Sequence, residues 1–122
     1  GRPEAAAGSF QQALKLRPDM AEAILQLVWL RAADPDAGVR DGPAAVALAQ
    51  RLVRIAGGRQ PAALDALAAA LAEAGRFGPA AATAGRAEAM AAEFGMTQLA
   101  DEIHQRRLGY RSGRPYRGRG VP

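Results

Sequence analysis

Apolar residues recur at intervals of three and four along most of the chain, the spacing that lines one face of an α-helix. Leu64, Leu67 and Leu71 form the clearest such stripe. Prolines stand at the start of several runs and glycines at their ends, because proline suits the first turn of a helix and glycine terminates one. The pattern predicts helices over residues 3–16, 19–33, 43–56, 60–74, 79–94 and 97–110.

The second run differs from the others because residues 24–30 are apolar almost all round. A helix of this kind is buried on more than one side or presents a face to a partner. Before it, Asp19 and Glu22 have the spacing of a capping box. After it, residues 33–43 are rich in Asp, Pro and Gly, and they are expected to form a long connector.

Composition supports a helical protein of one domain. Alanine dominates the apolar residues, whereas the 122 residues include only three Phe, two Tyr and one Trp. Alanine is the best helix former, and strands favour β-branched and aromatic residues. The absence of cysteine excludes disulfides and thiolate metal sites. No apolar run approaches the roughly 20 residues of a membrane helix. The compartment stays open, with the cytoplasm favoured.

Charge divides the chain into two parts. Residues 1–105 carry ten basic and twelve acidic side chains, whereas residues 106–122 carry six arginines and no acid. From residue 111 onward the sequence has no apolar periodicity, which is typical of a disordered segment. We therefore expect a helical domain over residues 1–110 and a basic disordered tail over residues 111–122.

Residues 72–89, AEAGRFGPAAATAGRAEA, allow two interpretations. A glycine-rich loop that holds a phosphate would follow a strand and lead into a Lys-Ser or Lys-Thr pair. Neither feature is there. The alternative is a turn between two helices, in which Gly75 ends the first helix and Pro79 opens the second. We favour the turn.

The same region strongly resembles one tetratricopeptide repeat. In that family a helix with bulky apolar residues ends in a glycine, an aromatic residue follows two positions later, and a small residue lies where the second helix crosses the first. Those roles fall here to Leu64, Leu67, Ala68, Leu71, Gly75, Phe77, Ala80, Ala84 and Ala87. The first run matches the second half of such a unit through Gly1, Ala6, Phe10, Ala13 and Pro18.

The resemblance implies an all-α, right-handed helical solenoid of about two and a half helix hairpins with a C-terminal capping helix. We expect the chain to be the C-terminal portion of a longer bacterial protein of this family. The middle unit departs from the pattern, because its connector is too long, and Ala47 or Ala49 could be its crossing residue. The uncapped front end around Phe10 leaves self-assembly, and hence a homodimer, as an alternative function.

Catalysis is not expected from these residues. His104 is the only histidine, and a base or ligand role needs partners that the sequence does not supply. Asp65 and Glu73 are eight residues apart on one predicted helix, about 12 Å, which is too far to share a proton. No P-loop, dinucleotide fingerprint or nucleophile elbow is there. We predict no catalytic, metal or cofactor site.

A concave groove is the stronger candidate for function. In the repeat family the first helix of each unit lines a concave surface that binds partner segments. By resemblance the groove residues here are Glu22, Leu25, Trp29, Ala33, Asp65, Ala69 and Glu73. Trp29 would then be a binding anchor, and the alternative is that it is an ordinary core residue. The carboxylates favour an apolar or basic segment, so we predict a scaffold that binds a protein or peptide.

The tail is a second candidate. Its arginines could contact phosphates, and the two tyrosines between them could stack on bases. The arginines are Arg106, Arg107, Arg111, Arg114, Arg117 and Arg119. The alternative is a solubilising terminus, or arginines that pair with the acidic body. We favour that alternative and regard weak nucleic-acid binding as the rival function.

Overall fold

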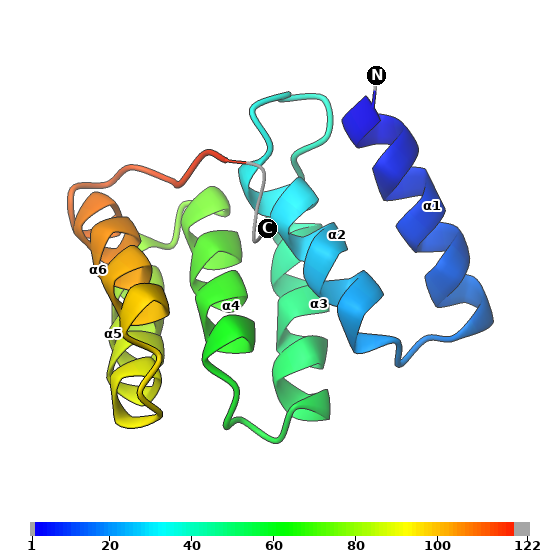
Figure 1. The fold of residues 1–122 in the computed structure, drawn as a ribbon. Coiled ribbons are helices and arrows are strands. Elements are labelled where there is room, and N and C mark those ends of the chain that lie inside the picture. The colour runs from blue at the N-terminus through cyan, green and yellow to red at the C-terminus, as the bar shows by residue number, and fades with distance from the viewer. Residues whose placement is uncertain (1, 119–122) are drawn as a thin grey trace.

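The computed structural model describes residues 2–118. In this range the chain forms six helices (Figure 1), which are α1 (Arg2–Leu16), α2 (Ala21–Ala33), α3 (Gly42–Ile55), α4 (Pro61–Glu73), α5 (Phe77–Glu93) and α6 (Thr97–Arg111). The expected all-α fold is confirmed. Each helix begins and ends within two residues of its predicted bounds.

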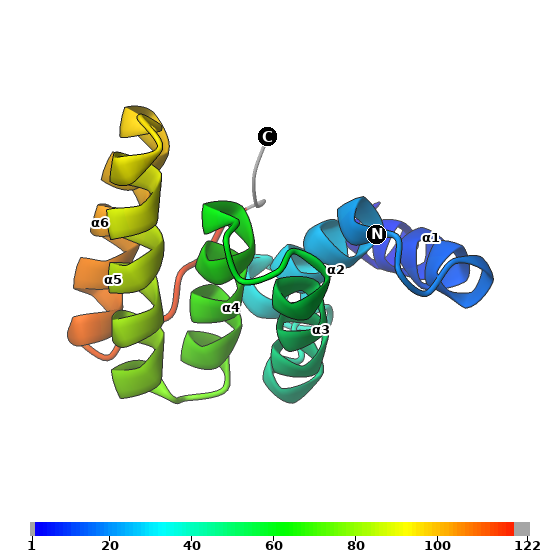
Figure 2. The same cartoon turned by 90° about the horizontal axis from the view of Figure 1, so that it is seen from below.

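The helices follow one another in space as they do in sequence. Each packs against the next along the chain, and α2 also packs against α4. Figure 1 shows the succession from α1 at one edge to α5 and α6 at the other, and Figure 2 shows it from below. The C-terminal ends of α2, α4 and α6 lie along the upper side of Figure 1. This common side is where the candidate site forms.

The core is made largely of alanine, which lets neighbouring helices approach closely. Helix α4 is buried on nearly every side, since ten of its thirteen residues are buried. Ile24 and Val28 of α2 are fully buried beside it. At the front edge Phe10 is partly buried, and Leu16 is 84% exposed. Most of the apolar α2 run therefore lies inside the protein, with Leu25 and Leu30 only partly buried.

Glycines end α3, α4, α5 and α6 with one repeated turn. Gly75 has a φ of +80°, and its N–H donates to the Ala72 carbonyl at 3.0 Å. The Arg76 N–H donates to the Leu71 carbonyl at 2.8 Å. This pair of bonds satisfies carbonyls that the end of α4 would leave without partners, and the left-handed φ favours glycine. The turn interpretation of residues 72–89 is confirmed.

The helix starts were predicted less well than the ends. The capping box at Asp19 is wrong, because α2 begins at Ala21 and its N-cap is Met20, which makes no side-chain cap bond. The turn after Pro18 leaves Asp19 one residue outside the cap position. By contrast, Asp41 does cap α3, since its carboxylate accepts from the Ala44 N–H at 3.1 Å.

Helix α3 approaches α4 closely at Gly42. A Cβ on this residue would lie 2.8 Å from the backbone nitrogen of Ala74, so only glycine fits without a backbone shift. Further along α3, Ala49 is buried and Ala47 is exposed. The inward face of the third helix therefore contains Ala49, which settles the register that the sequence left open.

The hairpin of α4 and α5 gives a first prediction. Ala80 of α5 is fully buried, so replacing it with leucine forces extra side-chain volume into a closed helix crossing. We expect Ala80→Leu to lower the free energy of unfolding by about 1–3 kcal/mol. Ala82→Leu, on the exposed side of the same helix, is the matched control and should cost little. Urea denaturation followed by circular dichroism measures both, and equal effects would contradict the packing argument.

Candidate functional site

The segment after α6 returns across the molecule because of a turn at Gly113. Gly113 has a φ of +75°, its N–H donates to the Tyr110 carbonyl at 3.0 Å, and the Arg114 N–H donates to the Gly109 carbonyl at 2.9 Å. This is the same helix-ending turn as at Gly75. It directs the following residues back over the upper ends of the helices toward α2 (Figure 1).

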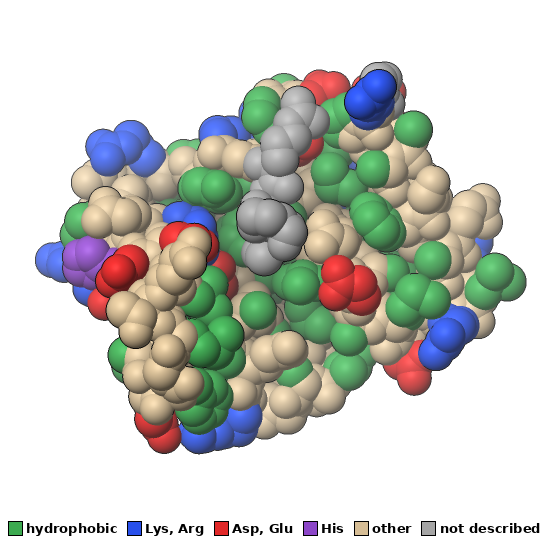
Figure 3. Space-filling model, in the orientation of Figure 1, with side chains coloured by type: hydrophobic (Ala, Val, Ile, Leu, Met, Phe, Trp, Pro, Cys, Tyr) green, Lys and Arg blue, Asp and Glu red, His purple; other side chains and the backbone are tan. Residues whose placement is uncertain are grey.

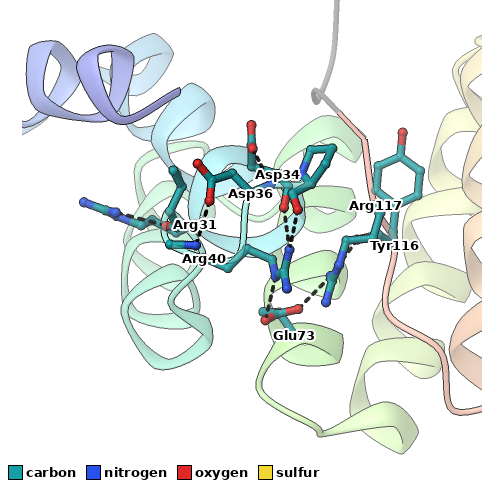
Figure 4. A network of polar contacts seen from close by, with 10 residues as sticks. Arg31, Asp34, Asp36, Arg40, Glu73, Tyr116 and Arg117 are labelled. Atoms are coloured by element: carbon teal, nitrogen blue, oxygen red, sulfur yellow. Dashed lines mark hydrogen bonds and ion pairs between the residues drawn. The ribbon is translucent and has the colours of Figure 1, made fainter. Parts of the chain in front are cut away.

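Residues 114–118, here called the C-terminal segment, contact the ends of two helices. The Tyr116 ring meets Trp29 edge-on, with ring centroids 5.8 Å apart and an interplanar angle of 82°. Arg117 Nη1 lies 2.7 Å from Glu73 Oε1. The Gly118 N–H donates to the carbonyl of Ala33, the last residue of α2, at 2.9 Å. Figure 4 shows Tyr116 and Arg117 of this segment, with Arg117 directed at Glu73.

The surface that receives this segment is here called the tail-binding face, and it consists of Trp29, Ala33, Glu73 and Arg106. In the space-filling view of Figure 3, apolar side chains gather on the same side of the molecule, over α2 and α4. Three of the four residues were among the predicted groove positions. The fourth, Arg106, was assigned to phosphate contacts instead.

The defined position of this segment differs from the disorder expected for residues 111–122. Arg111 is the last residue of α6, and residues 114–118 make the contacts just described, while residues 119–122 lie outside the described part of the chain. The physical reason is that disorder was inferred from the missing apolar periodicity. A short extended segment needs no periodicity when one aromatic ring, one arginine and one N–H find partners on the folded body.

Arg106 lies at the centre of the site and is fixed by a buried carboxylate. Its Nε and Nη2 atoms donate to the two oxygens of Asp65 at 3.1 and 2.7 Å. Its guanidinium carbon is 5.5 Å from the centre of the Trp29 ring and 5.2 Å from that of Tyr116. Such cation–π contacts hold the aromatic pair against the cation. Arg106 therefore links α4, α2 and the C-terminal segment.

Burial perturbs the titration of this cluster. Burial raises the pKa of the Asp65 carboxyl above its ordinary value, and Arg106 opposes that shift. Burial would lower the pKa of Arg106, but the charge and hydrogen bonds of Asp65, together with Tyr110 and Tyr116, raise that pKa above its ordinary value. Burial also raises the pKa of the neighbouring Tyr110 hydroxyl. Ion pairing thus keeps Arg106 charged inside the protein.

Glu73 joins the C-terminal segment to the long connector between α2 and α3. Its Oε2 accepts from Arg40 Nε at 3.3 Å, while Oε1 faces Arg117. Arg40 also donates to the Asp34 carbonyl at 2.8 Å, and Arg31 donates to the Val39 carbonyl at 3.0 Å (Figure 4). The connector that departs from the repeat pattern therefore holds the Glu73 carboxylate in place.

The other predicted groove residues lie away from these contacts. Glu22 is exposed and accepts from Gln26 at 3.2 Å. Leu25 is partly buried against the core, and Ala69 is buried within it. Trp29 is only 2% exposed, so it is packed like a core residue although it contacts the segment that covers it. The assignment of Glu22, Leu25 and Ala69 to a partner site stays a prediction.

Three of the arginines assigned to phosphate contacts face carboxylates of this chain. Arg106 pairs with Asp65 and Arg117 with Glu73, and Arg107 Nε donates to Glu88 at 2.9 Å. Glu88 also lies 3.2 Å from Nδ1 of His104. Of the remaining three, Arg111 and Arg114 are exposed, and Arg119 lies outside the described residues.

Three buried polar atoms in this region have no hydrogen-bond partner within residues 2–118, namely Trp29 Nε1, Tyr110 Oη and Glu73 Oε1. Glu73 Oε1 faces Arg117 as an ion pair, whereas Trp29 and Tyr110 are nearly fully buried. A buried donor without an acceptor costs free energy that a suitable partner group would restore. The contacts of the C-terminal segment thus leave the tail-binding face incompletely satisfied at Trp29.

The sequence indicated that the arginines could pair with the acidic body, but it did not identify Asp65 as the partner of Arg106, and it did not predict the return of the C-terminal segment. A signal for each was there. Asp65 is the single charge in an otherwise apolar stretch from Pro61 to Ala72, which indicates a buried partner. Gly113 follows its helix as Gly75 and Gly95 follow theirs, which indicates the same turn.

Comparison with known proteins adds no assignment, because no protein-family model, curated protein or solved structure matches the chain. The described residues contain no group of three or more His, Cys, Asp or Glu side chains arranged to hold a metal ion. None of the helices within residues 2–118 is long and apolar enough to cross a membrane.

Proposed function

We propose that the chain is a non-catalytic protein–protein interaction module of the tetratricopeptide type, and that its tail-binding face holds an extended segment of a partner protein. The helix order, the glycine turns at Gly75 and Gly95 and the buried small residue Ala80 support the repeat architecture. Gly75 and Ala80 are among the residues that carry the resemblance in the sequence.

One observation carries the functional part of the proposal. A short extended segment, residues 114–118, already lies on this face through a ring contact, an ion pair and a backbone hydrogen bond. Recognition of extended peptides uses this combination, in which backbone bonds give affinity and side-chain contacts give specificity. A face that accepts one such segment has the chemistry to accept another.

Nucleic-acid binding is the weaker proposal. Phosphate contacts need arginines that are free to leave their protein partners. Arg106, Arg107 and Arg117 instead face Asp65, Glu88 and Glu73. Displacing these carboxylates would cost much of the electrostatic gain, most of all for the buried pair of Arg106.

The proposal is tested by selecting a random displayed peptide library against the full chain that carries Tyr116→Ala and Arg117→Ala, two changes that release the C-terminal segment. We expect enriched peptides that bind in solution and that bind less tightly when Glu73→Gln is added. Glu93→Gln is the matched control, because Glu93 lies on α5 and faces the exposed Arg59 at 3.7 Å. Failure to enrich any peptide, or peptides indifferent to Glu73→Gln, would contradict the proposal.

A further inference from the structure

We propose that the tail-binding face selects an extended segment in which a tyrosine is followed by an arginine and then by a small residue. Residues 114–118 occupy the face in cis until such a partner segment displaces them. This inference rests on the proposed function and adds the chemistry of the partner to it.

The place of the aromatic residue is defined by Trp29 and Arg106. Tyr116 presents its ring to the Trp29 ring at 82° and to the Arg106 guanidinium at 5.2 Å. Asp65 is buried and accepts two hydrogen bonds from Arg106, which fix the orientation of the guanidinium group beside the rings. A flat, electron-rich ring satisfies both neighbours at once. This position therefore favours tyrosine over an aliphatic side chain.

The next position favours a cation. Glu73 presents Oε1 to Arg117, and its other oxygen is held by Arg40. Ala33 and Glu73 are the last residues of α2 and α4, and a helix C-terminus carries partial negative charge. A carboxylate and two helix ends on one side of the molecule therefore attract a basic residue, and the planar guanidinium of arginine suits the carboxylate.

The third position is selected through the backbone. The Gly118 N–H donates to the Ala33 carbonyl, one of the carbonyls that the end of α2 leaves without a helical partner. Proline cannot make this bond. A Cβ on Gly118 would collide with the hydroxyl end of Tyr116. Glycine, the small residue that has a free N–H and no Cβ, thus completes the recognised pattern.

The C-terminal segment is an occupant that a better partner can displace. The Arg117 side chain is 36% exposed, which weakens its ion pair with Glu73. Trp29 Nε1 has no acceptor within residues 2–118. The segment competes mainly because it is tethered, and tethering gives it an effective concentration on the order of millimolar. A partner segment that also supplies an acceptor to Trp29 would overcome that advantage.

The experiment measures binding of a labelled peptide with the sequence of residues 111–118, RSGRPYRG, by fluorescence anisotropy. The receptors are the full wild-type chain and the full chain with Tyr116→Ala and Arg117→Ala, both checked for folding by circular dichroism. Release of the tethered competitor should tighten peptide binding by at least about tenfold. Emission of Trp29, the only tryptophan, should also change when the segment is released.

Two further variants test the chemistry. Adding Glu73→Gln to the released chain should weaken peptide binding by about fivefold, the effect of an ion pair that is partly exposed. Adding Glu93→Gln should leave it unchanged. A peptide with alanine in place of its tyrosine should also bind about fivefold more weakly.

Equal binding to the wild-type and released chains would overturn the inference. Absence of peptide binding to the released chain would also overturn the inference. If library-selected peptides of other composition still bind, the proposed function survives. If no library peptide binds either, the inference and the proposed function both fail. Sedimentation measures whether either chain forms a dimer. If the wild-type chain is a dimer and the released chain is a monomer, the tail-binding face holds the tail of a second copy. That result would overturn the inference that the occupant is a segment of another protein.

Discussion

Replacing Arg106 with methionine is expected to lower the free energy of unfolding by about 3–5 kcal/mol. The substitution keeps an unbranched apolar stem but removes both hydrogen bonds to Asp65. The Asp65 side chain is only 1% exposed, so its charge would stay buried without a counterion. That uncompensated charge, rather than the loss of a favourable pair, is the main source of the destabilisation. Urea denaturation followed by circular dichroism measures the effect.

The adjacent arginine is the matched control. Arg107 pairs with Glu88, and both side chains are about a quarter exposed, so Arg107→Met should change the free energy of unfolding by about 1 kcal/mol or less. Combining Arg106→Met with Asp65→Leu should recover much of the lost stability, because an apolar pair often replaces a buried ion pair without loss. Equal costs for the two arginine variants would show that the Asp65 charge is not buried.

The sequence predicted the helices well because local signals determine them. Gly75 and Gly95 need a left-handed φ, and they end α4 and α5 where the pattern placed the ends. The helix starts were predicted less accurately. Asp19 is a residue type that caps helices, but it lies one position before the N-cap of α2, Met20. A cap depends on backbone geometry at a single residue, whereas an apolar stripe averages over a whole helix.

The site could be predicted only in part, because its residues come from separate helices. Resemblance to a repeat family indicated Trp29, Ala33 and Glu73, and these three contact the C-terminal segment. The identity of the contacting segment did not follow from the sequence. It depends on the direction that the chain takes after the turn at Gly113 and on how α2, α4 and α6 lie relative to one another. Tertiary packing, rather than local pattern, determines the second of these.

The same packing determines what Trp29 does. The sequence left two roles for this residue, an anchor in a groove or a member of the core. The indole is 2% exposed and belongs to the hydrophobic core, yet its ring edge meets Tyr116 of the C-terminal segment. Trp29 therefore packs in the core and also contacts the C-terminal segment. Core packing and the ring contact each contribute a separate part of the free energy of unfolding.

Trp29→Ala is accordingly expected to lower the free energy of unfolding by about 3–5 kcal/mol, the cost of removing a large buried aromatic side chain. Denaturation must be followed by circular dichroism, because the substitution removes the only tryptophan. Leu25→Ala is the control, since Leu25 lies one turn earlier on α2 and is only partly buried. A smaller loss for Trp29→Ala than for Leu25→Ala would contradict its place in the core.

A double-mutant cycle separates the contribution of the C-terminal segment from that of the core. Trp29→Ala and Tyr116→Ala should be coupled by about 0.5–1.5 kcal/mol, the range for an aromatic pair in contact. The remaining cost of Trp29→Ala should persist when Tyr116 is absent, because it comes from helix packing. If the two substitutions are additive, the contact between the two rings contributes nothing to stability, and the C-terminal segment is held by Arg106, Glu73 and Ala33.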